Sequence, residues 1–210
     1  MIDQAKITIR PARSCTQDSE ILAMLHHETL SDYLLAALGT PYLQKTHYPK
    51  LLNHDKTFCL IAYYKEEAVG FICITYDASD LMKTVQDNKL ALILPALSAV
   101  FANPLFIHDF ISLSIGTEMR WYKKATTQAE LLTVGVLPDY QSFGIGKLLV
   151  EKGMQIVMQE SAAHRVLVKT DTLRAAKFYE RFGFERVGFE DRGSVTNFLM
   201  VLDLQCMDLL

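Results

Sequence analysis

The segment from Val134 to Leu149 constrains the fold of this 210-residue chain more than any other. It reads, in order, as an apolar strand, a turn at Pro138, and a loop with Gly144 and Gly146 that runs directly into a helix. Glycine lets a backbone approach a ligand closely, and the first amides of a helix point donors at an anion. The segment therefore predicts an anion-binding turn. A diphosphate is a suitable ligand for it, and Lys147 would add positive charge at the edge of the turn.

Three interpretations of this turn compete. A dinucleotide-binding fingerprint requires Gly or Ala as its last residue, but Leu149 stands at that position. A loop of the nucleoside-triphosphate-binding kind requires Ser or Thr directly after its lysine, but Leu148 follows Lys147. The third interpretation is a plain glycine turn at the start of a helix. A G-x-G pattern by itself does not displace that interpretation.

The rest of the chain mixes short helical and extended segments. Strand composition or alternation covers residues 6–10, 58–64, 68–76, 131–136, 165–169, 184–190 and 195–202. Helical spacing covers residues 21–29, 33–38, 42–52, 145–157 and 175–182. Since neighbouring strands are expected to pair, we predict an α/β (α+β) fold with a mixed, largely antiparallel sheet flanked by helices.

The connection over about 77–125 is unusually long and apolar. We expect an apolar helical insert there, acting either as a lid over an acceptor pocket or as the face of a possible homodimer. Its uncharged stretch from Leu90 to Ile107 is about as long as a membrane span, but Pro95 and Pro104 interrupt it, so no membrane span is expected. For this chain length, a single domain over 1–210 is the expectation.

Charge and cysteine content narrow the possible partners. The formal net charge is −3 and the basic residues are scattered, whereas binding to nucleic acid requires a basic excess or stripe, so no nucleic acid is expected. Cys59 and Cys73 lie in apolar runs, where cysteines act as small buried hydrophobes. A reduced, cytoplasmic protein fits this usage better than a disulfide framework. No Cys/His spacing matches a zinc site, so no metal is expected.

Two segments together resemble the general-control-type N-acetyltransferase (GNAT) superfamily. Its cofactor signature is [Gln/Arg]-x-x-G-x-[Gly/Ala], preceded by V-x-P on a strand. The matching residues are Gln141, Gly144 and Gly146, with Val136 and Pro138 before them. The second segment, Ala175–Phe184, looks like the A-x-x-[Phe/Leu]-Y-x-x-x-G-F helix of the superfamily. The resemblance is strong over 130–190, topological over 5–76 and absent over 77–125.

The resemblance implies that acetyl-CoA binds in a V-shaped gap between the motif strand and the next strand. Val134 and Val136 are then expected to offer backbone groups to the pantetheine arm. The diphosphate is expected to bind the amides of Ser142, Phe143, Gly144, Ile145, Gly146 and Lys147. Gln141 and Thr172 complete the expected cofactor-binding residues, although relatives usually have the longer Asn at the position of Thr172.

The resemblance also implies transfer of an acetyl group to a primary amine by direct attack. Tyr179 falls where family members often place the acid that protonates the leaving thiolate, and a phenol is neutral at pH 7 and able to donate. Glu130 is the best candidate for the base, because family members often carry a carboxylate on that strand. A core aromatic and a solvated strand-end carboxylate are the structural alternatives for the two residues.

The acceptor is not encoded in these motifs. A small-molecule or peptide amine is expected, but neither the amine nor the length of the acyl chain can be inferred. The alternative function is a CoA-binding regulatory module without turnover, which would retain the glycine loop and lack working catalytic groups.

Overall fold

The computed structural model describes residues 4–31, 33–78, 80–81, 128–191 and 196–206, and the single positions 95 and 100. The predicted insert over 77–125 therefore lies almost wholly outside the described residues, as does the uncharged stretch over 90–107. Among the helices that are described, none has the length and apolar character needed to cross a membrane.

In the described part of the chain, seven strands form one sheet in the order β1-β2-β3-β4-β5-β7-β6. They are β1 (Ile7–Pro11), β2 (Thr57–Tyr64), β3 (Glu67–Thr75), β4 (Gln128–Val136), β5 (Arg165–Thr170), β6 (Glu185–Asp191) and β7 (Thr196–Asp203). Only β4 and β5 pair in parallel, and every other neighbouring pair is antiparallel. The predicted mixed, largely antiparallel sheet with flanking helices is confirmed.

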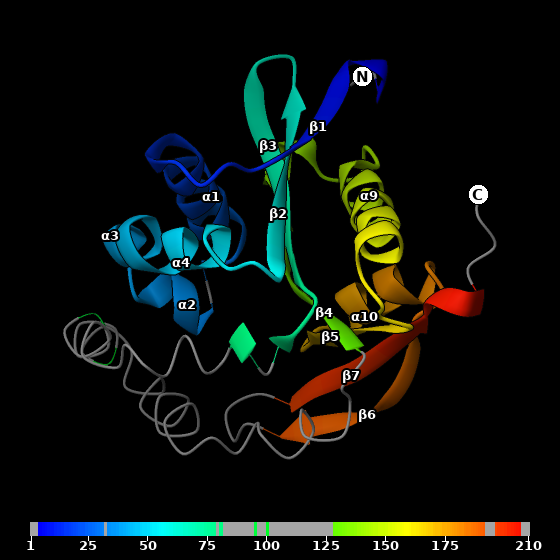
Figure 1. Cartoon of the computed structure of the whole chain (residues 1–210). Coiled ribbons are helices and arrows are strands. Elements are labelled where there is room, and N and C mark those ends of the chain that lie inside the picture. Colours follow the sequence, from blue (N-terminus) through cyan, green and yellow to red (C-terminus); the bar gives the residue numbers. More distant parts are fainter. Residues whose placement is uncertain are drawn as a thin grey trace.

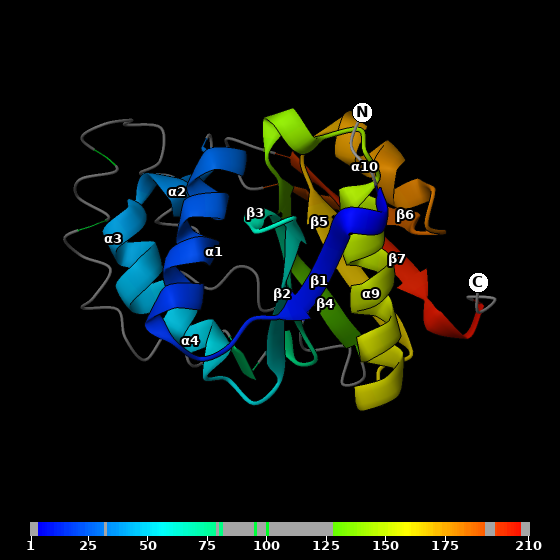
Figure 2. The same ribbon diagram turned by 90° about the horizontal axis from the view of Figure 1, so that it is seen from above.

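Helices cover both surfaces of this sheet (Figures 1 and 2). On one surface lie α1 (Thr16–Thr29), α2 (Leu34–Ala37), α3 (Thr40–Tyr42), η2 (Leu43–His47) and α4 (Tyr48–Leu52); on the other lie α9 (Ile145–Glu160) and α10 (Leu173–Glu180). We call the two surfaces the α1 face and the α9 face. The short helix η1 (Gln4–Lys6) precedes β1, η3 (Pro138–Tyr140) lies between β4 and α9, and η4 (Leu204–Cys206) follows β7. The segment predicted as one helix over 42–52 contains a π-helical turn, η2, just before Pro49, which has no N–H to donate.

Each face has its own hydrophobic core. Alternating strand residues separate the two cores, so that Leu60 and Ala62 point to the α9 face while Cys59 and Ile61 point to the α1 face. On the α9 face, α9 buries one stripe: Ile145, Leu149, Val150, Gly153, Met154 and Val157. Each fully buried large aliphatic side chain contributes roughly 1.5–3 kcal/mol of transfer free energy. The sheet is therefore fixed from both sides.

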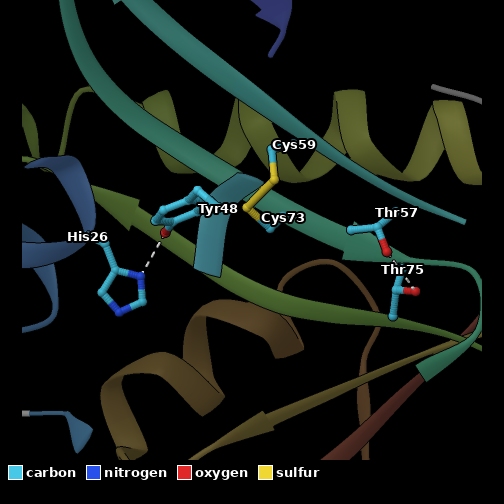
Figure 3. Close-up of a disulfide and its surroundings, with 6 residues drawn as sticks. All are labelled: His26, Tyr48, Thr57, Cys59, Cys73 and Thr75. Atoms are coloured by element: carbon cyan, nitrogen blue, oxygen red, sulfur yellow. Dashed lines mark hydrogen bonds between the residues drawn. A yellow bond between two sulfur atoms is a disulfide. The ribbon is translucent and has the colours of Figure 1, made fainter. Parts of the chain in front are cut away.

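Cys59 and Cys73 are buried as predicted, but the expectation of a protein without disulfides is wrong. The two residues lie opposite each other on β2 and β3, and they form a disulfide on the α1 face (Figure 3). Hydrophobic runs in the sequence indicate that each cysteine is buried. They do not reveal the strand register that places the two sulfur atoms together, because a β-bulge at Ala62 and Tyr63 shifts the register of this hairpin by one residue.

Candidate functional site

β4 and β5 part in the middle of the sheet. They pair from Gln128–Arg165 to Leu131–Val168, and β4 then continues to Val136 without a partner on β5. A β-bulge lies at the same level, because Leu131 and Thr133 face consecutive residues of β3 while Leu132 has no partner there. A bulge bends its strand. The bend carries β4 away from β5 and leaves a V-shaped gap between the two strands.

The backbone groups of Val134 and Val136 point into this gap. The Leu137 amide donates to the Val69 carbonyl over 2.9 Å, so it points toward β3. Successive residues of a strand direct their backbone groups to opposite sides, and those of Val134 and Val136 therefore point away from β3. In agreement with this, the Val136 carbonyl accepts a hydrogen bond from Gln141 Nε2 over 3.1 Å. The orientation is the one expected for binding an extended ligand.

The glycine loop ends in a group of helix-terminal amides. Ser142 and Gly144 both have positive φ, 67° and 83°, and Gly144 is the N-cap of α9. The Leu148 amide donates to the Gly144 carbonyl over 3.0 Å. The amides of residues 145–147 precede this first helical bond, so they have no acceptor within the helix. Together with the positive end of the helix dipole, they form a site suited to an anion.

Side chains from distant segments hold this loop in place. Gln4 Nε2 donates to the Phe143 carbonyl over 2.9 Å. Arg174 Nη2, at the start of α10, donates to Gln141 Oε1 over 3.0 Å. Gln141 therefore joins the end of β4 to α10 through both atoms of its side-chain amide. We predicted Gln141 as a cofactor-binding residue, and the contacts seen here give it a role in holding the loop.

Two other predicted cofactor residues have side-chain contacts within their own helices. Thr172 is the N-cap of α10, and its Oγ1 accepts from the Ala175 amide over 3.2 Å. Lys147 Nζ lies 3.5 Å from Glu151 Oε1 on the exposed side of α9. These contacts stabilise the helix starts on either side of the gap. Contact of either side chain with a cofactor stays a prediction.

Tyr179 is a buried phenol on α10, only 5% exposed. Its ring packs against Phe178 and Phe184, with centroids 5.3 and 5.5 Å away. Burial raises the pKa of Tyr179 well above its usual value, and the nearby Tyr33 phenol raises it further. Within the described residues its hydroxyl has no hydrogen-bond partner. Tyr179 thus combines the packing of a core aromatic with a neutral donor that no described protein group uses.

Glu130 is buried on β4, 6% exposed, just before the strands part. Its Oε1 lies 3.7 Å from Lys169 Nζ of β5. The neighbours Ala129 and Leu131 belong to the core of the α9 face, so Glu130 points to the α1 face. It is therefore not a solvated carboxylate at a strand end, which was the structural alternative.

On the α1 face, the end of α1 lies directly against β4. A Cβ added to Gly135 would lie 2.8 Å from a ring atom of Phe71 and would collide with Thr29 of α1. One turn earlier on α1, His26 Nδ1 is hydrogen-bonded to Tyr48 Oη over 2.7 Å (Figure 3). Burial, and to a lesser extent the neighbouring His27, lowers the pKa of His26 to about 4. The α1 helix is thus fixed beside the gap by close packing and a buried polar pair.

Tyr33, between α1 and α2, reaches the other side of the gap. Its hydroxyl donates to Asp171 Oδ1 over 2.8 Å, directly after the end of β5. Sequence reasoning missed Tyr33, Asp171 and Arg174 as members of the site. No local pattern marks them, since their contacts join segments far apart in the chain. Among the described residues, no group of three or more His, Cys, Asp and Glu side chains is arranged to hold a metal ion.

Comparison with known proteins agrees with this geometry. The model of the Acetyltransferase (GNAT) family matches residues 22–184. No curated protein matches the chain by sequence. Among solved structures, a GNAT-family acetyltransferase from Streptococcus pneumoniae is 18% identical, with a TM-score of 0.58 over 94% of this chain and 98% of that one.

Two further solved structures are complexes with acetyl-CoA or coenzyme A. Arabidopsis thaliana NAA60, in complex with acetyl-CoA, is 16% identical, with a TM-score of 0.58 over 95% of this chain and 99% of that one. The PaiA N-acetyltransferase from Thermoplasma acidophilum, in complex with coenzyme A, is 17% identical, with a TM-score of 0.56 over 94% and 98%. At these identities the likeness is one of fold.

Proposed function

This chain belongs to the acetyltransferase (GNAT) family, and on that premise we propose that it transfers an acetyl group from acetyl-CoA to a primary amine of a small molecule or peptide. One observation supports the proposal above all others. β4 leaves β5 at Leu132, and the end of β4 leads through the glycine loop to the amides that begin α9. A strand edge and an anion site in this order suit a pantetheine arm that ends in a diphosphate.

The residues present fit coenzyme A in three places. Amides of the loop and helix start, from Ser142 to Lys147, would hold the diphosphate, because they lack intrahelical acceptors. The edge of β4 at Val134 and Val136 would form β-type hydrogen bonds with the amides of the pantetheine arm. The Val134 amide would also donate to the thioester carbonyl, where negative charge develops during acyl transfer. Thr172 and Lys147 lie at the two helix starts that border these positions.

The acyl transfer needs two proton movements. Acetyl-CoA supplies the acetyl group as a thioester, whose C–S bond breaks while a C–N bond to the amine forms. Tyr179 donates its phenolic proton to the departing sulfur, a role that suits a donor kept neutral by burial. Glu130 accepts the proton that the amine loses. Its carboxylate points to the α1 face, from which the amine would approach, and Lys169 lies 3.7 Å from it.

An acceptor screen that detects released thiol tests this proposal. Purified protein, acetyl-CoA and a panel of primary amines should release free coenzyme A in an amine-dependent way, with acetylated amine as the matching product by mass spectrometry. Tight binding of coenzyme A without turnover of any amine would instead favour a regulatory CoA-binding module.

The proposal includes the setting in which the enzyme works. We propose an enzyme that needs acetyl-CoA but no metal and no nucleic acid, with a homodimer as a possible assembly. The net charge of −3 supports a small-molecule or peptide partner over nucleic acid. Gel filtration with light scattering tests the assembly, and retention of activity in a chelator tests independence from metal.

A further inference from the structure

A hydrogen bond connects the two sides of the gap beyond the last β4–β5 pair. Tyr33 belongs to the helical layer on the α1 face, and it is 41% exposed. Asp171 follows β5, the strand from which β4 has parted. The bond between the Tyr33 hydroxyl and Asp171 Oδ1, 2.8 Å long, therefore borders the side from which an acceptor must approach.

Tyr33 also interacts with the proposed proton donor. Tyr33 acts electrostatically on Tyr179, which comes from α10 on the α9 face. The two phenols thus approach each other from opposite faces, and Asp171 is hydrogen-bonded to one of them. Asp171 is thus linked through Tyr33 to the residue that is proposed to protonate the thioester sulfur.

We propose that Asp171 binds the ammonium group of the acceptor and that Tyr33 is a positioning residue that orients the Asp171 carboxylate. The inference rests on the proposed function and narrows its substrate class to amines that arrive as cations, between α2 and the end of β5. Tyr33 occupies Oδ1 of Asp171, while Oδ2 accepts no hydrogen bond from a described residue. That second oxygen provides the acceptor for a charge-assisted hydrogen bond.

The other charged groups on this face favour Asp171 over Glu130 for this role. Glu130 has the Lys169 ammonium 3.7 Å away, and both side chains are largely buried. An incoming cation would meet a carboxylate whose charge is already balanced. Asp171 has a neutral phenol as its partner, so its charge is not balanced by that contact. Arg174, three residues further on, donates to Gln141 on the loop side.

A pair of coenzyme A derivatives tests the inference without knowledge of the natural acceptor. S-(3-aminopropyl)-coenzyme A and S-butyl-coenzyme A have similar length and differ in a terminal ammonium or methyl group. Calorimetric titration should give the wild-type protein a roughly tenfold preference for the ammonium probe, as expected for a hydrogen bond to a charged group. In Asp171→Asn this preference should disappear, while affinity for the butyl probe stays unchanged and shows that the variant is folded.

Two further variants separate positioning from charge. Tyr33→Phe keeps the carboxylate and removes its orienting donor, so we expect the preference to fall only in part. Asp55→Asn makes the same chemical change as Asp171→Asn on an exposed turn before β2, and it should keep the full preference. Equal wild-type affinity for both probes, or an unchanged preference in Asp171→Asn, overturns the inference alone. Failure of coenzyme A and both probes to bind overturns the proposed function itself.

Discussion

The α9 face and the α1 face of this molecule are built in different ways. On the α9 face, the gap, the glycine loop and the start of α9 follow one another along a short stretch of chain, from Leu132 to Lys147. On the α1 face, the groups that border the gap come from distant segments. They are joined by single contacts such as His26–Tyr48 and Tyr33–Asp171.

This difference matches the two halves of the proposed reaction. A diphosphate and a pantetheine arm can be bound largely by main-chain groups, which depend on backbone shape more than on side-chain identity. An acceptor is recognised by side chains, and those can change while the backbone stays the same. We therefore propose that the α9 face binds the donor and that the α1 face selects the acceptor.

The largest expected effect concerns Tyr179, the proposed acid on the α9 face. Tyr179→Phe should lower kcat roughly 100-fold, as for loss of a general acid, with little change in affinity for coenzyme A. Steady-state kinetics with an amine found in the screen would measure it. Tyr76→Phe, the same change at a tyrosine hydrogen-bonded to Glu160, should leave kcat unaltered. Equal activity of the wild-type protein and Tyr179→Phe would exclude Tyr179 as the acid.

As the pH falls, we expect the packing of the α1 face to lose stability before that of the α9 face. The pKa of His26 is lowered to about 4 by burial, so the unfolded chain binds a proton first as the pH falls. The contribution of neutral His26 is complete above about pH 6.5 and is lost as the pH falls toward 4, a decrease of roughly 3 kcal/mol in unfolding free energy. His47, whose pKa burial lowers to about 3, adds a further decrease over the same range. Urea titrations from pH 7.5 to 4 measure this slope.

A control variant tests whether the fall in stability with acid comes from buried and not from exposed histidines. His164→Gln changes an exposed histidine between α9 and β5, and it should leave the acid slope intact. A wild-type stability that does not change between pH 6.5 and 4 would contradict the burial of a neutral His26.

Two glycines of the same loop should respond differently to alanine. Gly144 has φ 83°, where an L-residue is strained by roughly 1–2 kcal/mol, so Gly144→Ala should weaken coenzyme A binding about tenfold. At Gly146 an added Cβ would lie 3.5 Å from Phe178, an ordinary contact, so Gly146→Ala should bind nearly as the wild type does. Calorimetry on both variants provides the comparison. Equal losses at the two positions would show that backbone conformation is not the cause.

The smallest effect is expected for the hydrogen bond through which Arg174 of α10 supports the glycine loop. Arg174→Met removes the hydrogen bond to Gln141 Oε1, and affinity for coenzyme A should fall only about threefold, as for one exposed hydrogen bond. Arg165→Met removes an arginine paired with Asp203 near the start of β5 and serves as the control. A loss of more than about a hundredfold in Arg174→Met would mean that Arg174 binds the ligand directly.

The sequence predicted most of what is local. Period-two and helical spacing placed the strands and the α9 and α10 helices, and the glycine pattern placed the loop at the start of α9, because these features depend on neighbouring residues. The backbone groups of Val134 and Val136 also point into the gap, as expected. Their contacts with coenzyme A, and the roles of Tyr179 and Glu130, stay predictions.

What could not be predicted depends on contacts and registers that no local pattern marks. Hydrophobic runs show that Cys59 and Cys73 are buried, but only the bulge-shifted β2–β3 register makes them a disulfide. The partners of Gln141 and Tyr33 lie on α10 and after β5, and nothing in the local pattern of either residue indicates them. For the same reason, the groups on the acceptor side of the gap could be identified only from the structure.

Calorimetric titration of the purified protein with coenzyme A and, separately, with pantetheine tests most directly whether the amides that begin α9 hold the diphosphate. We predict a single site for coenzyme A and an affinity for pantetheine at least 100-fold weaker, because pantetheine lacks the phosphates. Equal affinity for the two molecules, or no affinity for coenzyme A in a protein whose circular dichroism and cooperative unfolding show an intact fold, would contradict the account.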